Sequence, residues 1–119
     1  MSFLPPDVLG LGSATIDDIL YIDHFPQVDT KQQAQRVERF GGGLTATALV
    51  AVARLGKRAV FAGQMGRDDA SRWVVDDLAR DGVDVSAVVY EDAARPIQAW
   101  IMVEPPPRST RTILYTVPD

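Results

Sequence analysis

Residues 40–66 read FGGGLTATALVAVARLGKRAVFAGQMG, and this stretch decides the fold. Its three consecutive glycines, Gly41, Gly42 and Gly43, keep side chains out of the way and allow backbone conformations that are closed to other residues. Residues 44–55 contain no proline or glycine and are nearly all small or apolar, and Gly56 follows as a stop. A helix that is apolar all round is a buried helix. The stretch therefore predicts a glycine turn that leads directly into a buried helix.

The glycine turn has two interpretations. The first turn of a helix has unpaired N–H groups at the positive end of the helix dipole, so residues 42–47 could receive hydroxyl oxygens or developing negative charge. Alternatively, the glycines only let a core helix pack tightly against a sheet. A glycine triplet by itself does not separate the two.

Composition restricts the class of protein. The 119 residues are 46% apolar and 24% charged with a net charge of −4, which is typical of one soluble globular unit. The acidic balance argues against a nucleic-acid or anionic-membrane partner, and no apolar run approaches the ~18 residues of a membrane span. We expect a cytoplasmic location. With no cysteine and with His24 as the one histidine, neither a thiolate site nor a histidine cluster can bind a metal.

Upstream of the glycines, residues 8–12 form a short apolar run that predicts a buried strand, followed by Asp17 and Asp18. Carboxylates just past the carboxyl end of a parallel strand lie where open α/β sheets bind ligands. Asp17 is thus a candidate for holding substrate hydroxyls, whereas Asp18 is interpreted as solvated. The alternative for each is an ordinary carboxylate in a turn.

Residues 19–23 and 36–40 both have strand character and predict a hairpin-like excursion between the first strand and the glycines. Lys31 lies in this excursion and could approach an anionic substrate group, although most loop lysines are simply solvated. His24 is interpreted as a turn residue. After the buried helix we expect a strand over 58–63, a helix capped by Asp68, Asp69 or Ser71 that runs to about Arg80, and a strand over 85–90. Alternating strands and helices imply a parallel sheet with right-handed crossovers.

The last segment has a different character. Residues 96–104 and 110–117 are two strand-like runs joined by a proline-rich turn. Trp100, Met102 and Tyr115 place large apolar groups on strands that no following helix covers. Such a face needs a partner, which could be the excursion, a second copy of the chain or further sequence.

The order of these motifs resembles the amino-terminal part of ribokinase-like (PfkB) carbohydrate kinases. The resemblance rests on a strand ending Gly-Ser-x-x-x-Asp, the turn Gly-Gly-Gly-x-x-Ala-Thr-Ala, a helix closing Ala-Arg-Leu-Gly, then Gly-x-x-Gly-x-Asp and Gly-Val-Asp. Residues 41–48 and 98–103 look nearer to sulfofructose kinase and ketohexokinase-like members than to ribokinase itself. The resemblance implies an α/β protein: part of a ribokinase-like three-layer fold, with a parallel sheet and helices, plus a β-sheet lid. The core would be 7–18 and 41–90, and the lid 19–40 and 96–117.

Position by position, the resemblance implies a sugar site. Asp17 matches the acceptor of sugar hydroxyls, and Gly42 and Gly43 match the backbone that closes over the sugar. Thr47 matches a polar position in the first helical turn where many members have Asn, and Lys31 aligns with a lid-region lysine that would meet the anionic group of a sulfosugar. The lid strands of such enzymes often pair between subunits, which implies a homodimer.

The resemblance also implies ATP and Mg²⁺ for the complete enzyme. The family's carboxy-terminal Gly-Ala-Gly-Asp turn, with its anion hole and catalytic base, has no counterpart after Tyr115. We therefore expect this chain to be the sugar-binding and lid portion of a kinase, with the carboxy-terminal half missing, no catalytic or nucleotide-binding residues, and no activity alone.

Two other functions compete with the sugar kinase. Gly10-Leu11-Gly12-Ser13-Ala14-Thr15 has the spacing of a dinucleotide-binding turn, which requires a helix immediately afterwards. The other is a non-enzymatic β-lid module that binds a sugar or pairs with another subunit.

Overall fold

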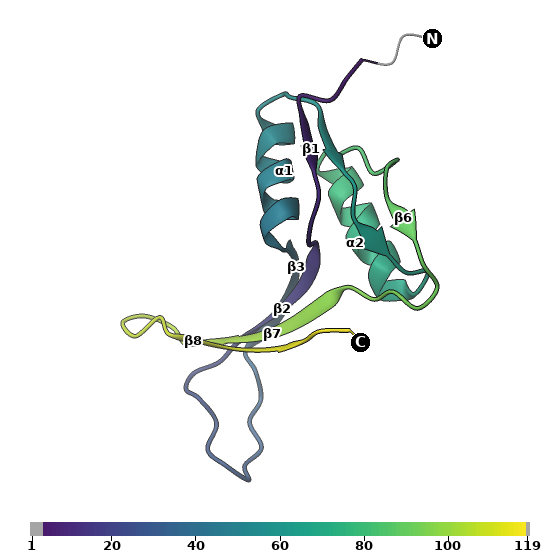
Figure 1. Ribbon diagram of the computed structural model, residues 1–119. Coiled ribbons are helices and arrows are strands. Elements are labelled where there is room, and N and C mark those ends of the chain that lie inside the picture. Colours follow the sequence, from purple (N-terminus) through teal and green to yellow (C-terminus); the bar gives the residue numbers. More distant parts are fainter. Residues whose placement is uncertain (1–3, 119) are drawn as a thin grey trace.

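The computed structural model describes residues 4–118 and has two parts (Figure 1). One part is an α/β core, and the other is a four-stranded sheet that projects from the core as an arm, which we call the lid sheet. The arm makes the molecule elongated, with extents of 60 × 33 × 17 Å. This division into core and arm matters because the candidate site lies where the two parts join.

The core contains two short parallel strand pairs and two helices. Strand β1 pairs with β4, β5 pairs with β6, and α1 contacts both β1 and β4. The largest fully buried side chains are Phe61, Ile16 and Leu49, which come from β4, the base of the lid sheet and α1. One core therefore joins all three. The elements are β1 (Val8–Gly10), α1 (Leu44–Arg54), β4 (Ala59–Phe61), β5 (Gln64–Met65), α2 (Asp69–Arg80) and β6 (Val89–Tyr90).

The lid sheet has the strand order β3-β2-β7-β8. The antiparallel pair β2 and β3 is the expected hairpin, closed by the loop over residues 22–35. Strand β7 runs parallel to β2 and antiparallel to β8, so strands far apart in sequence share one sheet. The strands are β2 (Thr15–Tyr21), β3 (Arg36–Gly42), β7 (Ile97–Val103) and β8 (Arg111–Thr116).

Alternation along β2 gives the lid sheet two faces. Asp17 and Ile19 lie on one face, which we call the Asp17 face, and Ile16 and Asp18 lie on the other, the Asp18 face. Ile16 is fully buried in the core cluster together with Leu78 of α2. The base of the Asp18 face is therefore packed against the core, whereas the Asp17 face points the other way.

The structure corrects several expectations. Asp17 and Asp18 lie within strand β2 and not in a turn after β1, because the lid sheet begins at Thr15 and takes both residues into its hydrogen-bonded ladder. For the same reason a strand, and not a helix, follows residues 10–15, so the dinucleotide-binding interpretation is wrong. The expected strand over 85–90 is reduced to β6 (Val89–Tyr90).

Helix α1 has the expected extent but is not buried on all sides. Only Ala46 and Leu49 are buried, while Leu44 is 89% exposed. Within residues 4–118, strands β1 and β4 pack against this helix and cover one of its faces. Helix α2 begins after Asp68 and ends at Arg80 as expected, with Val74 and Leu78 buried and Arg72, Asp76 and Arg80 exposed.

No helix in the described part of the chain has the length and apolar character required to span a bilayer.

Candidate functional site

The candidate site is centred on the carboxylate of Asp17, which lies directly over Gly42. A Cβ built on Gly42 would stand 2.4 Å from Asp17 Oδ2 and 2.7 Å from Thr15 Oγ1. The Thr15 hydroxyl donates a hydrogen bond to Asp17 Oδ1 at 3.1 Å. Gly42 is thus required because only a glycine leaves room for the Asp17 side chain, and the glycine turn and the carboxylate form one corner.

Gly43 shapes the other side of this corner. Its φ of 95° is in the region that favours glycine, and a Cβ there would stand 2.6 Å from the Ser13 carbonyl oxygen. The amide of Ala46 donates to this same oxygen at 3.2 Å, and that of Thr47 donates to the Gly43 carbonyl at 3.0 Å. The first turn of α1 is thereby fixed against the segment that leads into β2, and Thr47 is exposed beside it.

The register of the lid strands surrounds Asp17 with mostly apolar side chains. Phe40 of β3 and Ala99 of β7 lie directly opposite Asp17, and Tyr115 of β8 lies opposite Ala99. Phe40 and Tyr115 are 45% and 66% exposed. The next row on the same face holds Ile19, Ile101 and Ile113, together with Glu38 of β3, which is paired with Arg36. A carboxylate beside aromatic and aliphatic side chains suits a ligand that carries both hydroxyl and C–H surfaces.

On the opposite face, Asp18 has a structural partner that its position in the sequence did not reveal. Arg39 Nε and Nη2 donate to Asp18 Oδ1 and Oδ2 at 2.7 and 2.9 Å, and the same guanidinium lies 5.6 Å from the ring centroid of Trp73 in α2. The hydrogen bonds that Arg39 donates to Asp18 raise the pKa of Arg39 above its ordinary value, against a smaller lowering by burial. Asp18 is therefore paired and not simply solvated.

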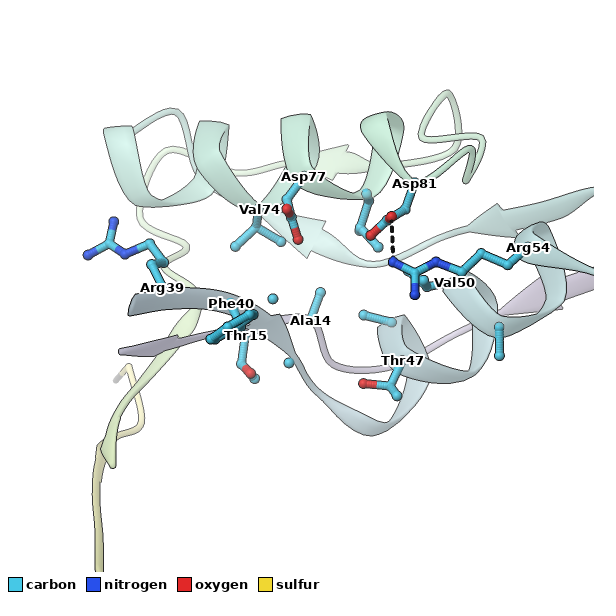
Figure 2. Close-up of a pocket in the computed structure, with 15 residues that line it drawn as sticks. Ala14, Thr15, Arg39, Phe40, Thr47, Val50, Arg54, Val74, Asp77 and Asp81 are labelled. Atoms are coloured by element: carbon cyan, nitrogen blue, oxygen red, sulfur yellow. Dashed lines mark hydrogen bonds and ion pairs between the residues drawn. The ribbon is translucent and has the colours of Figure 1, made fainter. Parts of the chain in front are cut away.

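A cavity of about 580 Å³ lies between α1, α2 and β3 (Figure 2). Its lining includes Gly42 and Thr47, so it reaches the candidate corner, but Asp17 does not line it. Asp77 points from α2 toward β3, and Arg54 of α1 meets Asp81 Oδ1 at 2.9 Å across the cavity. Sequence reasoning missed this cavity because it expected α1 to be covered on every side.

The charged groups at the cavity are paired within the protein. Arg54 is bound to Asp81, Asp77 accepts from Arg80 at 3.0 Å, and Arg39 is bound to Asp18. The remaining lining is mostly apolar, so no charged group there points to a particular ligand. The Asp17 corner, whose carboxylate faces away from α2, remains the better candidate.

Lys31 and His24 lie away from this corner. Both are exposed in the loop 22–35, which begins beyond the end of β2 at Tyr21. Tyr21 lies four positions along the strand from Asp17, which is roughly 13 Å at the usual rise per residue. The structure brings Asp17, Gly42, Gly43 and Thr47 together and places Lys31 at the far end of the hairpin.

Within residues 4–118, no group of three or more His, Asp or Glu side chains could hold a metal ion.

Comparison with known proteins identifies the family of the chain. The profile of the pfkB family of carbohydrate kinases matches residues 6–119, and the chain belongs to this family. The chain is 28% identical over 116 residues to ketohexokinase from Mus musculus, covering 94% of this chain and 38% of that protein. It is 27% identical over 97 residues to ribokinase from Staphylococcus aureus, covering 81% and 32% respectively.

A solved structure shows the same fold. The fructokinase with bound ATP from Xylella fastidiosa superimposes with a TM-score of 0.72 at 27% identity, covering 93% of this chain and 33% of that one. The chain thus spans about a third of the length of these relatives. Identities of 27% and 28% to a ribokinase and a ketohexokinase do not separate the subfamilies.

Proposed function

We propose that this chain forms the sugar-binding and lid portion of an ATP-dependent carbohydrate kinase that phosphorylates a sugar hydroxyl. The observation that carries the proposal is the Asp17 carboxylate held over the side-chain-free backbone of Gly42. Membership of the pfkB family supports the reaction class, and the relative with bound ATP supports the phosphoryl donor.

Asp17 supplies the main recognition of hydroxyl groups. An ionised carboxylate only accepts hydrogen bonds, and charge-assisted bonds from hydroxyls are the stronger kind. One of its oxygens already accepts from Thr15, which orients the carboxylate and leaves lone pairs for a ligand. In this proposal two sugar hydroxyls donate to Asp17, while Phe40 and the isoleucines of the same face contact the C–H side of the ring.

The glycine turn and α1 form the second wall. In this proposal the backbone of Gly42 and Gly43 closes over the sugar, while the space that a Gly42 side chain would fill is occupied by the Asp17 carboxylate. Thr47 offers its hydroxyl in the first turn of α1, at the positive end of the helix dipole. Such a turn favours oxygen ligands and any negative charge that develops on them.

Lys31 refines the choice of substrate. We assign it the recognition of an anionic group at the distal end of the sugar, as in a sulfosugar kinase. Its position in the loop 22–35 supports this role only if the loop lies over the bound sugar.

ATP and Mg²⁺ belong to the proposed reaction but not to the residues described here. Phosphoryl transfer requires a base for the attacking hydroxyl, groups on the γ-phosphate and usually Mg²⁺. Within residues 4–118 no group of three or more His, Asp or Glu side chains could hold a metal ion, and the proposal assigns no residue of this chain to Mg²⁺ or to the nucleotide. The purified 119-residue chain is therefore expected to show no sugar-dependent ATP turnover.

The lid sheet also supports a homodimer. Strand β8 is an edge strand, and all six of its residues are exposed. An exposed edge with apolar side chains invites pairing, and a second copy of the same edge would satisfy its backbone groups.

The direct test of the function is sugar-dependent ADP formation by the full-length protein that contains this chain, measured with ribose, fructose and a sulfonated hexose. Turnover that depends on one of these sugars is expected. Sugar binding without ADP formation at saturating ATP would favour the non-enzymatic β-lid module. A protein that neither binds nor phosphorylates any of these sugars would overturn the proposal.

A further inference from the structure

The lid sheet is tied to the core at its base by a cluster of three side chains. Asp18 and Arg39 lie directly opposite each other in β2 and β3, and Arg39 binds Asp18 through two parallel hydrogen bonds. The face of the same guanidinium covers Trp73, which belongs to α2. We call Asp18, Arg39 and Trp73 the base clamp.

The base clamp has geometry that distinguishes it from an ordinary surface ion pair. Exposed pairs contribute little because two long side chains must be held in place. Here the Asp18 side chain is 14% exposed and that of Arg39 43%, two hydrogen bonds join them, and the guanidinium lies within cation–π distance of the Trp73 ring. Asp77 of α2 adds a second contact, because its carboxylate lies against Gly41 of β3. A Cβ placed on Gly41 would stand 2.3 Å from Asp77 Oδ2.

The clamp is one residue away from the candidate sugar ligand. Asp17 and Asp18 are consecutive in β2, so their side chains point to opposite faces of the same strand. The hydrogen bond that Thr15 donates to Asp17 and the contact of Asp17 with Gly42 both stay within the hairpin. The placement of that hairpin relative to α2 depends on contacts across the base, of which the clamp is the most specific.

We propose that Arg39, through Asp18 and Trp73, is a positioning residue that sets the angle of the lid sheet on α2 and thereby holds Asp17 where the sugar binds. This inference rests on the proposed function, because its expected effect is a change in sugar binding. Arg39 itself does not touch the sugar, since it lies on the Asp18 face.

The chain offers a matched control in Arg36. It lies on the same strand, forms an ion pair with Glu38 at 2.6 Å and covers the ring of Tyr21 at 4.0 Å. Both of its partners belong to the lid sheet itself, so it makes the same two kinds of contact without joining the lid to α2. Arg36 lies on the Asp17 face, opposite Tyr21 at the end of β2 that is far from the corner. Arg36→Gln therefore removes an ion pair and a ring contact from the same strand without removing a link to α2.

The experiment measures steady-state kinetics of the full-length protein and its Arg39→Gln, Asp18→Asn and Arg36→Gln variants. We expect the sugar KM to rise about threefold to tenfold in Arg39→Gln and Asp18→Asn, with the KM for ATP unchanged, and no change in Arg36→Gln. Combining Arg39→Gln with Trp73→Leu should raise the sugar KM less than the product of the two single effects, because the residues act as one unit. An unchanged sugar KM in both Arg39→Gln and Asp18→Asn would overturn the inference while leaving the kinase activity established.

Amide hydrogen exchange tests the clamp independently of catalysis. Residues 15–18 should exchange faster in Arg39→Gln than in the unmodified protein, while Arg36→Gln should leave exchange at residues 15–18 unchanged. Equal exchange in all three proteins would contradict the clamp even if the protein has no kinase activity. Should Arg39→Gln fail to fold, the near-isosteric Asp18→Asn gives the same two readouts.

Discussion

The carboxylate of Asp17 lies where the Cβ of any residue other than glycine would stand at position 42. A Cβ placed on Gly42 would stand 2.4 Å from Asp17 Oδ2, which is shorter than the contacts that Cβ atoms make in proteins. Asp17 and Gly42 are 25 positions apart in the sequence, yet the glycine turn and the carboxylate form one structural unit.

Replacing Gly42 with alanine should displace Asp17. The added methyl group would overlap the carboxylate and the Thr15 hydroxyl, so both side chains must turn away. We expect the sugar KM of the full-length enzyme to rise about tenfold or more, as when a charged acceptor loses its bonds.

Gly56→Ala provides the control for that change. Gly56 has a φ of 78° with no atom within 4 Å of a built Cβ, so alanine there strains the backbone without a clash. It should lower the free energy of unfolding by about 1 kcal/mol and leave the sugar KM unchanged. If Gly42→Ala also affects only stability, Asp17 does not depend on this glycine.

Thr47→Ala should have a smaller effect than any change at Asp17. A neutral hydrogen bond contributes about 0.5–1.5 kcal/mol, which corresponds to a rise in sugar KM of about threefold to tenfold. Thr112→Ala, an exposed threonine on β8, should leave sugar kinetics unchanged. A Thr47→Ala enzyme with unaltered sugar KM would remove this hydroxyl from the site.

Local sequence signals predicted the two helices of the core well. The glycine triplet, the small apolar run and Gly56 predicted α1 to within a residue, and Asp68 and Gly82 correctly bounded α2, because caps and stops act within a few residues. The two carboxylates at the start of β2 masked that strand, since Asp favours turns. Strand pairing to β3 and β7 overrides this preference.

Contacts between distant segments could not be predicted in this way. Arg39 with Trp73 and Arg54 with Asp81 join residues 34 and 27 positions apart, and nothing in the local pattern pairs them. The site residues Asp17, Gly42, Gly43 and Thr47 came from the resemblance to a family, and the structure places them around one corner. Their role in binding a sugar stays a prediction.

Asp84 makes the stability of the core sensitive to acid. Hydrogen bonds from the Ser86 hydroxyl and amide, followed by the nearby Arg58, outweigh burial and lower the pKa of Asp84 below its ordinary value. Such a group stabilises the fold when ionised, so its contribution is present above the unfolded-state pKa of about 3.9 and is lost as the pH falls through the lower folded-state pKa.

The Asp84→Asn variant should therefore melt below the unmodified protein at pH 7, and the difference in Tm should shrink as the pH falls below about 4. Thermal unfolding followed by circular dichroism at several pH values measures this. A Tm difference that stays constant down to pH 2.5 would show that the ionised carboxylate is not what stabilises this turn.

The homodimer should depend on the exposed strand β8. Leu114 is 61% exposed on this edge, and Leu114→Lys should convert a dimer into a monomer by placing like charges at the pairing surface. Sedimentation velocity measures the change. Val28→Lys, at a residue that is 96% exposed in the loop 22–35, should leave the dimer intact. An unmodified protein that is already monomeric would contradict the proposed pairing.

The most direct test of the account is the sugar dependence of ADP formation by the full-length protein and its Asp17→Asn variant. Asn keeps the shape of the side chain but removes the charge, and Asp76→Asn on the exposed face of α2 is the control. The account predicts sugar-dependent turnover, with a sugar KM at least about tenfold higher in Asp17→Asn and unchanged in Asp76→Asn. The same sugar KM in all three proteins would contradict it.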